Sequence, residues 1–163
     1  MIKKAILLVG LVSLAVSISI LNLAGESKST VPYPEGYRNW VHVKSMLILQ
    51  GHPLYDAFGG IHHIYANSKA LTGYKTGKFP DGSVIVFDLL EAKFENNTYV
   101  EGERKVVGVM YKDSRKFKET GGWGFEAFKG NTKERVVKNA EQDCFSCHAS
   151  QESTDFVFSQ YRK

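Results

Sequence analysis

Polar and apolar residues alternate over several short stretches of the chain, which is typical of β-strands. Strands are predicted at residues 61–65, 83–90, 104–111 and 123–128. The run at 83–90 is the clearest, because β-branched and aromatic residues dominate it. Residues 93–99 continue its alternation toward a predicted turn at Glu101 and Gly102, so this strand and the next form an antiparallel pair.

Fewer segments of the chain have the sequence pattern of a helix than that of a strand. Asn67 is a suitable cap for a short helix that runs through Tyr74 and ends at Gly77. A second helix is predicted over residues 134–148, near the carboxyl end. Residues 37–50 fit both a helix and a strand, and the chain shows no internal repeats or heptads.

The N-terminus has the pattern of a targeting segment. A positively charged start at residues 1–4 precedes a nearly continuous apolar run at residues 5–23. This run is also long enough for a membrane anchor, which needs about 20 apolar residues. We therefore predict a signal peptide at 1–24, cleaved or retained as an anchor, a polar linker at 25–32, and one domain at 33–163 in the periplasm.

The net charge and the cysteine content limit the classes of function that the chain can have. The formal net charge is +4, and two of the positive charges belong to Lys3 and Lys4 of the signal peptide. The exported part therefore lacks the basic surface typical of nucleic-acid binding. The two cysteines of the chain, Cys144 and Cys147, are three positions apart and are followed directly by His148.

This Cys-x-x-Cys-His pattern predicts one covalently attached haem c. The thiols of Cys144 and Cys147 would each form a thioether with a haem vinyl group, and His148 would bind the iron. A redox-active cysteine pair and half of a zinc site are the alternatives. The first normally accompanies a thioredoxin-like βαβ pattern, which the sequence does not show, and zinc requires further ligands at ordered spacing.

The second axial position of the iron decides what such a haem does. An electron carrier holds a methionine or a second histidine there. The candidates are Met46, Met110, His42, His52, His62 and His63. Each of them also suits an ordinary structural role, and without a side-chain ligand the iron stays open to a small molecule.

Aromatic residues give the pocket its predicted character. An apolar wall would favour neutral ligands such as NO or CO over water and anions. The candidates for such a wall, each of which also suits plain core packing, are Phe58, Phe87, Trp123, Phe125 and Phe128.

Several segments together resemble the cytochrome P-460 and cytochrome c'-beta family. The resemblance covers nearly all of the exported part and is carried by residues 33–40, 59–67, 79–86, 112–114 and 120–125 and by the terminal haem motif. It implies an α+β fold, mainly antiparallel β-sheet with a few helices, and not a four-helix bundle. It also implies a homodimer and a five-coordinate haem with His148 as the proximal ligand.

The family divides by its distal chemistry. One branch carries a lysine cross-linked to the porphyrin and oxidises hydroxylamine with help from a carboxylate, whereas the other caps the iron with phenylalanines and binds NO and CO. Phe58 and Phe87 resemble the two capping phenylalanines. Candidates for the cross-linking lysine are Lys69, Lys75 and Lys78. Weaker candidates for catalytic groups, which also suit solvated or surface-paired positions, are Glu126, Glu141 and Arg38.

These observations favour an exported single-haem c-type cytochrome whose five-coordinate haem binds NO or CO for NO scavenging or sensing. Hydroxylamine oxidation and simple electron transfer, with a partner cytochrome, are the alternatives. Whether the protein is an enzyme depends on the lysine cross-link.

Overall fold

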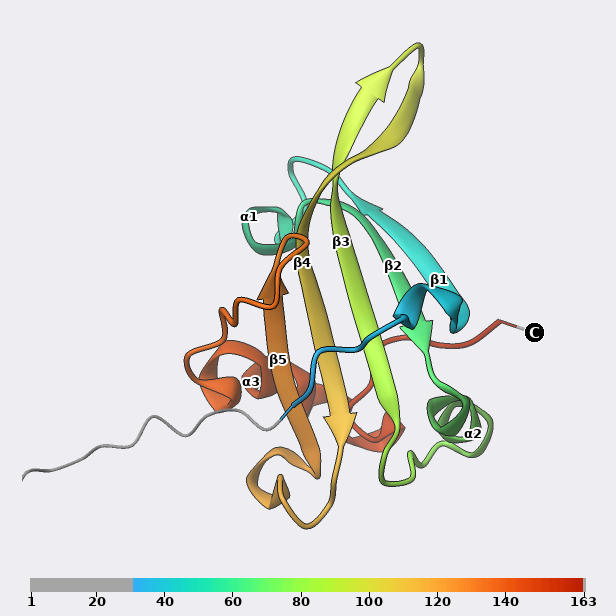
Figure 1. Ribbon diagram of the computed structural model, residues 1–163, viewed down its shortest axis with the longest axis vertical. Helices are drawn as coiled ribbons and strands as arrows, with labels where there is room; N and C mark the ends of the chain where they lie inside the picture. Colours follow the sequence, from blue (N-terminus) through green and yellow to red (C-terminus); the bar gives the residue numbers. More distant parts are fainter. Residues whose placement is uncertain (1–30, 163) are drawn as a thin grey trace, which may run out of the picture.

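The computed structural model describes residues 31–162, and its strands form one five-stranded antiparallel sheet in the order β1-β2-β3-β4-β5 (Figure 1). The strands are β1 (Val41–Ile48), β2 (Gly60–Ala66), β3 (Val84–Glu95), β4 (Thr98–Lys112) and β5 (Trp123–Lys129). Each strand pairs with the next one along the chain. The predicted strands are confirmed, and the ambiguous segment 37–50 contains β1. The predicted signal peptide at 1–24 lies outside the described residues.

The helices are short. They are α1 (Tyr55–Phe58), α2 (Ser68–Thr76) and α3 (Ser146–His148), with the 3-10 turns η1 (Tyr37–Asn39), η2 (Lys118–Thr120) and η4 (Ala149–Thr154) and the π-turn η3 (Glu141–Phe145). The side chain of Asn67 caps α2 by accepting from the backbone N–H of Ala70 at 2.9 Å, and Gly77 ends it with φ 78°. Within the described part of the chain, no helix has the length and hydropathy to cross a membrane. The α+β prediction is therefore confirmed.

The turn between β3 and β4 differs from the prediction. Asn96 and Asn97 form it with φ 48° and 60°, and Glu95 pairs with Thr98. Asparagine tolerates this left-handed region better than most residues, so the Asn-Asn pair makes a two-residue hairpin turn. The predicted turn at Glu101 and Gly102 is wrong, because both residues lie inside β4. The hairpin projects beyond the rest of the sheet (Figure 1).

The predicted helix over residues 134–148 is only partly correct. Helical turns begin at Glu141, because the side chain of Asn139 accepts from the backbone N–H groups of Glu141 and Gln142 at 3.1 and 3.2 Å. Asparagine is a strong N-cap and fixes the start of the helix there. Upstream of this cap the chain is extended, and Arg135 forms an isolated bridge with Phe128.

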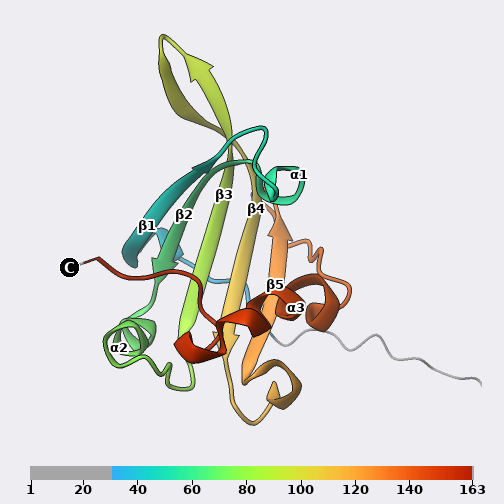
Figure 2. The ribbon, with the colours of Figure 1, turned by 180° about the vertical axis from the view of Figure 1, so that it is seen from behind.

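The two faces of the sheet carry different segments. The segment before β1, with η1, crosses one face, here called the N-terminal face (Figure 1). The segment from η3 to the C-terminus crosses the other, here called the motif face (Figure 2). Side chains alternate along a strand, so Val86 and Asp88 of β3 point to the N-terminal face and Phe87 points to the motif face.

The faces also differ in how completely they are covered. The N-terminal face has a buried cluster made of Val31, Tyr37, Val86, Val107, Val109 and Phe128. The end of the motif face nearest α2 is buried under a second cluster that includes Phe79, Ile85, Trp123, Phe125 and Val157. Its centre is only half-buried, at Phe87, Val106, Gly108, Met110 and Ala127. An antiparallel sheet can leave one face open to solvent, but that face is then usually polar, so the apolar residues at this half-buried centre are available to pack against a further group.

Candidate functional site

The three residues of the cysteine-histidine motif lie on one side of a helical segment. Cys144 lies in the last turn of η3, and Cys147 and His148 follow in α3. Positions three and four apart face the same way on a helix, so both sulfur atoms and the imidazole share one face. Cys144 and Phe145 pack against the buried cluster of the motif face. The motif is therefore presented toward the half-buried centre of that face.

A reciprocal cap holds the start of this helical segment. The carboxylate of Asp143 accepts from the backbone N–H groups of Lys138 and Asn139 at 3.1 and 2.9 Å. The side chain of Asn139 in turn caps the first turn of η3. Backbone groups at the N-terminus of a helix lack partners within the helix, so this arrangement fixes where the motif begins.

The two thiols are free. Cys147 is exposed and Cys144 is half-buried, and burial, aided by the charge of Asp143, raises the pKa of Cys144 to about 11. A redox-active cysteine depends on a lowered pKa, so Cys144 does not have the character of a disulfide-exchange site. In residues 31–162, no group of three or more His, Cys, Asp or Glu side chains is arranged to hold a metal ion. The zinc alternative therefore lacks a partner set in this region.

His148 is oriented by a backbone carbonyl. Its Nδ1 atom lies 2.7 Å from the carbonyl oxygen of Phe156, and since that oxygen only accepts, Nδ1 carries the hydrogen. The imidazole lies between the rings of Phe125 and Phe158, at centroid distances of 4.9 and 5.0 Å. Burial lowers the pKa of His148 and favours its neutral form. Its Nε2 atom is thus unprotonated and has an electron pair available to bind a metal.

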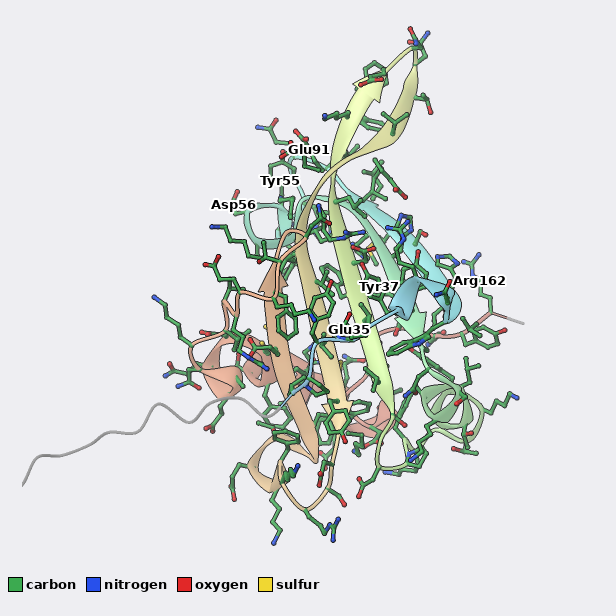
Figure 3. All side chains as sticks on the ribbon, viewed as in Figure 1. Glu35, Tyr37, Tyr55, Asp56, Glu91 and Arg162 are labelled. Carbon is green, nitrogen blue, oxygen red and sulfur yellow. The ribbon has the colours of Figure 1, made fainter. Side chains whose placement is uncertain are left out.

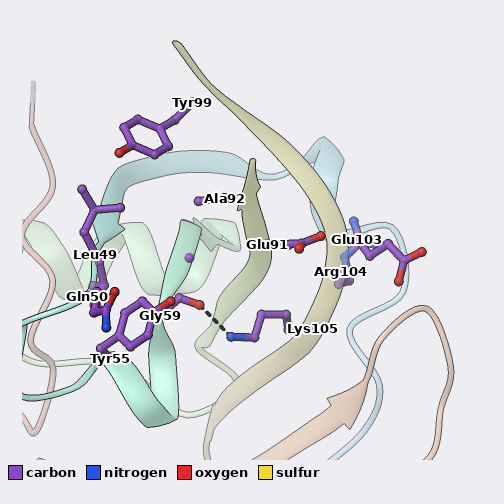
Figure 4. Close-up of a pocket in the computed structure, with 12 residues that line it drawn as sticks. Leu49, Gln50, Tyr55, Gly59, Glu91, Ala92, Tyr99, Glu103, Arg104 and Lys105 are labelled. Carbon is purple, nitrogen blue, oxygen red and sulfur yellow. Dashed lines mark hydrogen bonds between the residues drawn. The ribbon is translucent and has the colours of Figure 1, made fainter. Parts of the chain in front are cut away.

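Two phenylalanines meet on the same face of the sheet. Phe58 ends α1, and its ring meets the ring of Phe87 on β3 edge to face, at 5.7 Å and 78°. Gly60 secures the turn after Phe58, because its φ is 132° and a Cβ there would lie 2.1 Å from the carbonyl oxygen of Leu90. The ammonium of Lys105 donates to the carbonyl oxygen of Gly59 at 2.7 Å (Figure 4). These contacts hold Phe58 against Phe87.

Comparison with known proteins decides the family. The profile of the family described as Cytochrome P460 matches residues 34–159, which is most of the chain. The chain belongs to the cytochrome P460 family. It is therefore a haem cytochrome of the P460 and c'-beta kind, as the sequence predicted. Among curated proteins the comparison found no match.

The residues of this cytochrome fit a haem. The motif supplies two free thiols and a neutral imidazole with an available Nε2. Gly108 and Ala127 are register partners at the half-buried centre of the motif face, where small side chains leave room for a flat apolar group. The Phe156 carbonyl that orients the imidazole could not be predicted, because a main-chain acceptor has no sequence signature.

The candidate axial ligands of the cytochrome do not all lie on the same face of the sheet. His63 points to the N-terminal face, where it contacts the hydroxyl of Ser45 and the carboxylate of Glu101, both at 2.6 Å. His42 contacts the same hydroxyl at 2.9 Å. His52 lies in the exposed turn before α1 and accepts from a backbone N–H. These three histidines are held away from the motif.

The other three candidates belong to the motif face. His62 is 5% exposed, its ring lies 4.6 Å from that of Phe87, and its Nδ1 has no hydrogen-bond partner among the described residues. Burial, with a smaller contribution from His63, lowers the pKa of His62 to about 4. Met110 packs against the buried cluster of this face, and Met46 is exposed on the edge strand β1. His62 and Met110 are the side chains of this set that reach the covered part of the face.

The predicted catalytic groups lie elsewhere. Arg38 donates to the buried carboxylate of Asp88 at 3.2 Å, and Arg104 donates to the same carboxylate at 2.6 Å. Glu126 accepts from Arg135 at 2.6 Å. Asp88 and Glu126 both point to the N-terminal face, so the sheet lies between Arg38 and the motif. Glu126 lies on the edge strand β5, and its charge still acts on the thiol of Cys144. These positions do not support distal roles for the two residues.

The remaining polar candidates lie on the surface. Glu141 is exposed at the start of η3, close to the motif in sequence. Lys69 and Lys75 are exposed on α2, and Lys78 is exposed just after it. The ammonium of Lys69 donates to the carbonyl oxygen of Asp81 at 3.2 Å. The structure therefore does not bring these lysines to the Phe58 and Phe87 pair.

A separate groove lies beside the β3–β4 hairpin. It has a volume of about 750 Å³ and is lined by the end of β1, by α1 and by the base of the hairpin (Figure 4). Tyr55 and Glu91, which line it, lie near that base in Figure 3. Its lining residues include neither cysteine of the motif nor His148. The groove is therefore distinct from the cysteine-histidine motif.

Proposed function

We propose that this cytochrome carries a single haem c, attached through Cys144 and Cys147, with His148 as the proximal iron ligand and NO or CO as the distal ligand. The observation that carries this proposal is the edge-to-face pair of Phe58 and Phe87 on the same face of the sheet as the motif. An apolar cap of this kind favours a neutral diatomic molecule over water or an anion.

Each residue of the site has a defined task. The thiols of Cys144 and Cys147 would hold the haem by adding to its two vinyl groups, which would form S–C bonds and place the thiol hydrogens on carbon, so no oxidant would be needed. His148 supplies Nε2 and is held by the Phe156 carbonyl. When bound, the haem supplies an iron with one position for a small ligand. Phe58 and Phe87 exclude water from that position and limit the size of the ligand.

The positions of the charged residues favour this function over hydroxylamine oxidation. That reaction removes protons from the bound nitrogen compound and therefore needs a positioned base. Glu126 and Arg38 are paired on the opposite face, and the candidate lysines surround α2. Electron transfer would instead require His62 or Met110 to bind the iron.

The optical spectrum of the ferrous protein, combined with its intact mass, separates the three functions. We expect a high-spin c-type spectrum and a mass increment of one haem. A strongly red-shifted band of the P-460 type, with loss of further hydrogens from the mass, would establish a lysine cross-link and contradict the proposal. A low-spin spectrum would instead support an electron carrier.

Ligand kinetics test the apolar cap directly. Phe87→Ala and Phe58→Ala should each accelerate CO association about tenfold, which corresponds to a steric barrier of about 1.4 kcal/mol. Phe94→Ala is the matched control, because Phe94 is an exposed phenylalanine of the hairpin. Equal CO rates in all three variants and the parent protein would contradict a capping role.

We also propose that the protein is exported to the periplasm, forms a homodimer and serves NO scavenging or sensing. The support for export is the sequence pattern of residues 1–24. Fractionation of cells that produce the full chain should recover the haem protein in the periplasm, or in the membrane if the segment is retained. Sedimentation of the purified holoprotein should give twice the chain mass.

A further inference from the structure

A strained corner of the backbone presents the carbonyl that holds His148. Asp155 and Phe156 both have positive φ, at 55° and 66°. Aspartate is tolerated in this region, but a bulky phenylalanine is rarely found there. Such conformations persist only where the surrounding structure determines them. The chain therefore needs a specific anchor at the point where it meets the imidazole.

Asp155 is that anchor, because its backbone and its carboxylate are held by four groups. Its N–H donates to the carbonyl oxygen of Glu152 at 3.0 Å, and its carbonyl oxygen accepts from the indole N–H of Trp123 at 2.8 Å. Its carboxylate accepts from the backbone N–H of Phe79 and from the ammonium of Lys112, both at 2.8 Å. The side chains of Asp155 and Lys112 are about nine-tenths buried.

The next residue is fixed by packing. The ring of Phe156 lies directly over Gly121, where an added Cβ would approach it to 2.2 Å. It also packs on the ring of Phe145 at a centroid distance of 5.3 Å. The N–H of Phe156 donates to the carbonyl oxygen of Gln151 at 2.7 Å. These contacts fix the orientation of the Phe156 carbonyl, which points toward Nδ1 of His148.

We propose that Asp155, together with Lys112, is a positioning residue that sets the orientation and basicity of His148 as an iron ligand. This inference rests on the proposed function. A hydrogen bond to the second nitrogen of a metal-bound histidine orients its ring and raises its basicity. Lys112 ends β4 and Trp123 begins β5, so the buried ion pair joins the proximal ligand to the rigid sheet.

The test compares Asp155→Asn and Asp155→Ala with Asp88→Asn in the holoprotein. Asparagine keeps the tolerance for positive φ and one acceptor for Phe79, whereas alanine removes both acceptor oxygens. Asp88→Asn disrupts another buried ion pair, on the N-terminal face, and serves as the matched control. The measured quantities are the iron–histidine stretching frequency in the ferrous state and the reduction potential.

We expect the stretching frequency to fall and the potential to rise, slightly for asparagine and further for alanine. Asp88→Asn should destabilise the fold and leave both quantities unchanged. Unchanged values in both Asp155 variants, or equal shifts in the control, would overturn the positioning role. If the alanine variant does not fold, Lys112→Met replaces it, because this change removes the ammonium that donates to the Asp155 carboxylate and keeps an apolar side chain of similar length.

The proposed function can fail separately from this inference. A parent protein without an iron–histidine band in the ferrous state would show that the iron carries a second protein ligand. The reduction potentials of the Asp155 variants, measured against the control, would then still decide whether Asp155 positions His148.

Discussion

The N-terminal face and the motif face of one sheet are built on opposite principles. The N-terminal face is closed by buried apolar residues, and its charges are paired. The motif face is apolar at its centre and only half-covered, and it carries the two thiols and the imidazole. The difference teaches that the buried charges of the N-terminal face support the fold, whereas the half-buried apolar residues of the motif face mark the proposed site.

Two residues on β3 show the contrast at closest range. Asp88 points to the N-terminal face, is fully buried, and accepts from the guanidinium groups of Arg104 and Arg38. Phe87, the residue before it, points to the motif face and meets His62 and Phe58. Because side chains alternate between the two faces, a residue of the buried ion-pair network and a residue of the proposed ligand pocket are neighbours in sequence.

The largest effect is expected when a buried charge is removed from the N-terminal face. Asp88→Ala leaves Arg104, whose side chain is largely buried, without its carboxylate, and the loss of one partner of a buried pair costs about 3–5 kcal/mol. Denaturant unfolding should show this loss, while the haem spectrum and CO kinetics stay unchanged. Glu91→Ala is the control, because its pair with Lys93 is exposed and contributes below about 1 kcal/mol. Altered CO kinetics in Asp88→Ala would show that the faces are coupled.

A second test uses pH to charge the motif face. The pKa of His62 is lowered from 6.5 to about 4 by burial, so the unfolded chain takes up a proton at higher pH than the folded one. The free energy of unfolding is therefore highest above pH 6.5. It falls by about 3 kcal/mol in all as the pH decreases toward 4. His62→Leu should lack this part of the pH dependence. Parallel stability curves for the parent and variant between pH 7 and 4 would contradict the shift.

A third test compares phenylalanines on the two faces. Phe87→Ala should cost about 1.5 kcal/mol in unfolding free energy, because its side chain is only half-buried. Phe128→Ala removes a fully buried ring from the N-terminal face and should cost at least twice as much. CO association should change only in Phe87→Ala. The reverse pattern would place the ligand on the N-terminal face.

The smallest effect is expected at Arg38. Its side chain is 49% exposed, so its pair with Asp88 should contribute below about 1 kcal/mol. Arg38→Ala should therefore unfold almost as the parent does and bind CO at the same rate. A clear change in the CO rate would give Arg38 the distal role that the sequence suggested.

The sequence predicted those parts of the fold that depend on neighbouring residues. The strand over residues 83–90 and the cap at Asn67 follow from local alternation and local hydrogen bonding, and the structure confirms both. The turn was assigned to Gly102 instead of Asn96 and Asn97, since asparagine pairs signal a hairpin less strongly than glycine does. The helix before Glu141 was overpredicted, because a cap inside a helical pattern is hard to recognise.

Less of the candidate site than of the fold could be predicted from the sequence. Cys144, Cys147 and His148 lie within five consecutive residues, so their chemistry could be proposed from spacing alone, and it stays a prediction. The partners of Arg38 and Glu126 depend on strand register and on which face each residue occupies. The links from Asp155 to Lys112 and Phe79 join distant segments, and no local pattern records them.

The order of the strands has a consequence for how the chain opens. All four strand pairings join neighbours in sequence, so the sheet closes only short loops, and this topology favours rapid formation. The segment that ends at Asp155 must instead dock across the finished sheet. We expect it to exchange its amide hydrogens as a separate cooperative unit, ahead of β3 and β4. The cofactor end can then loosen without loss of the sheet beneath it.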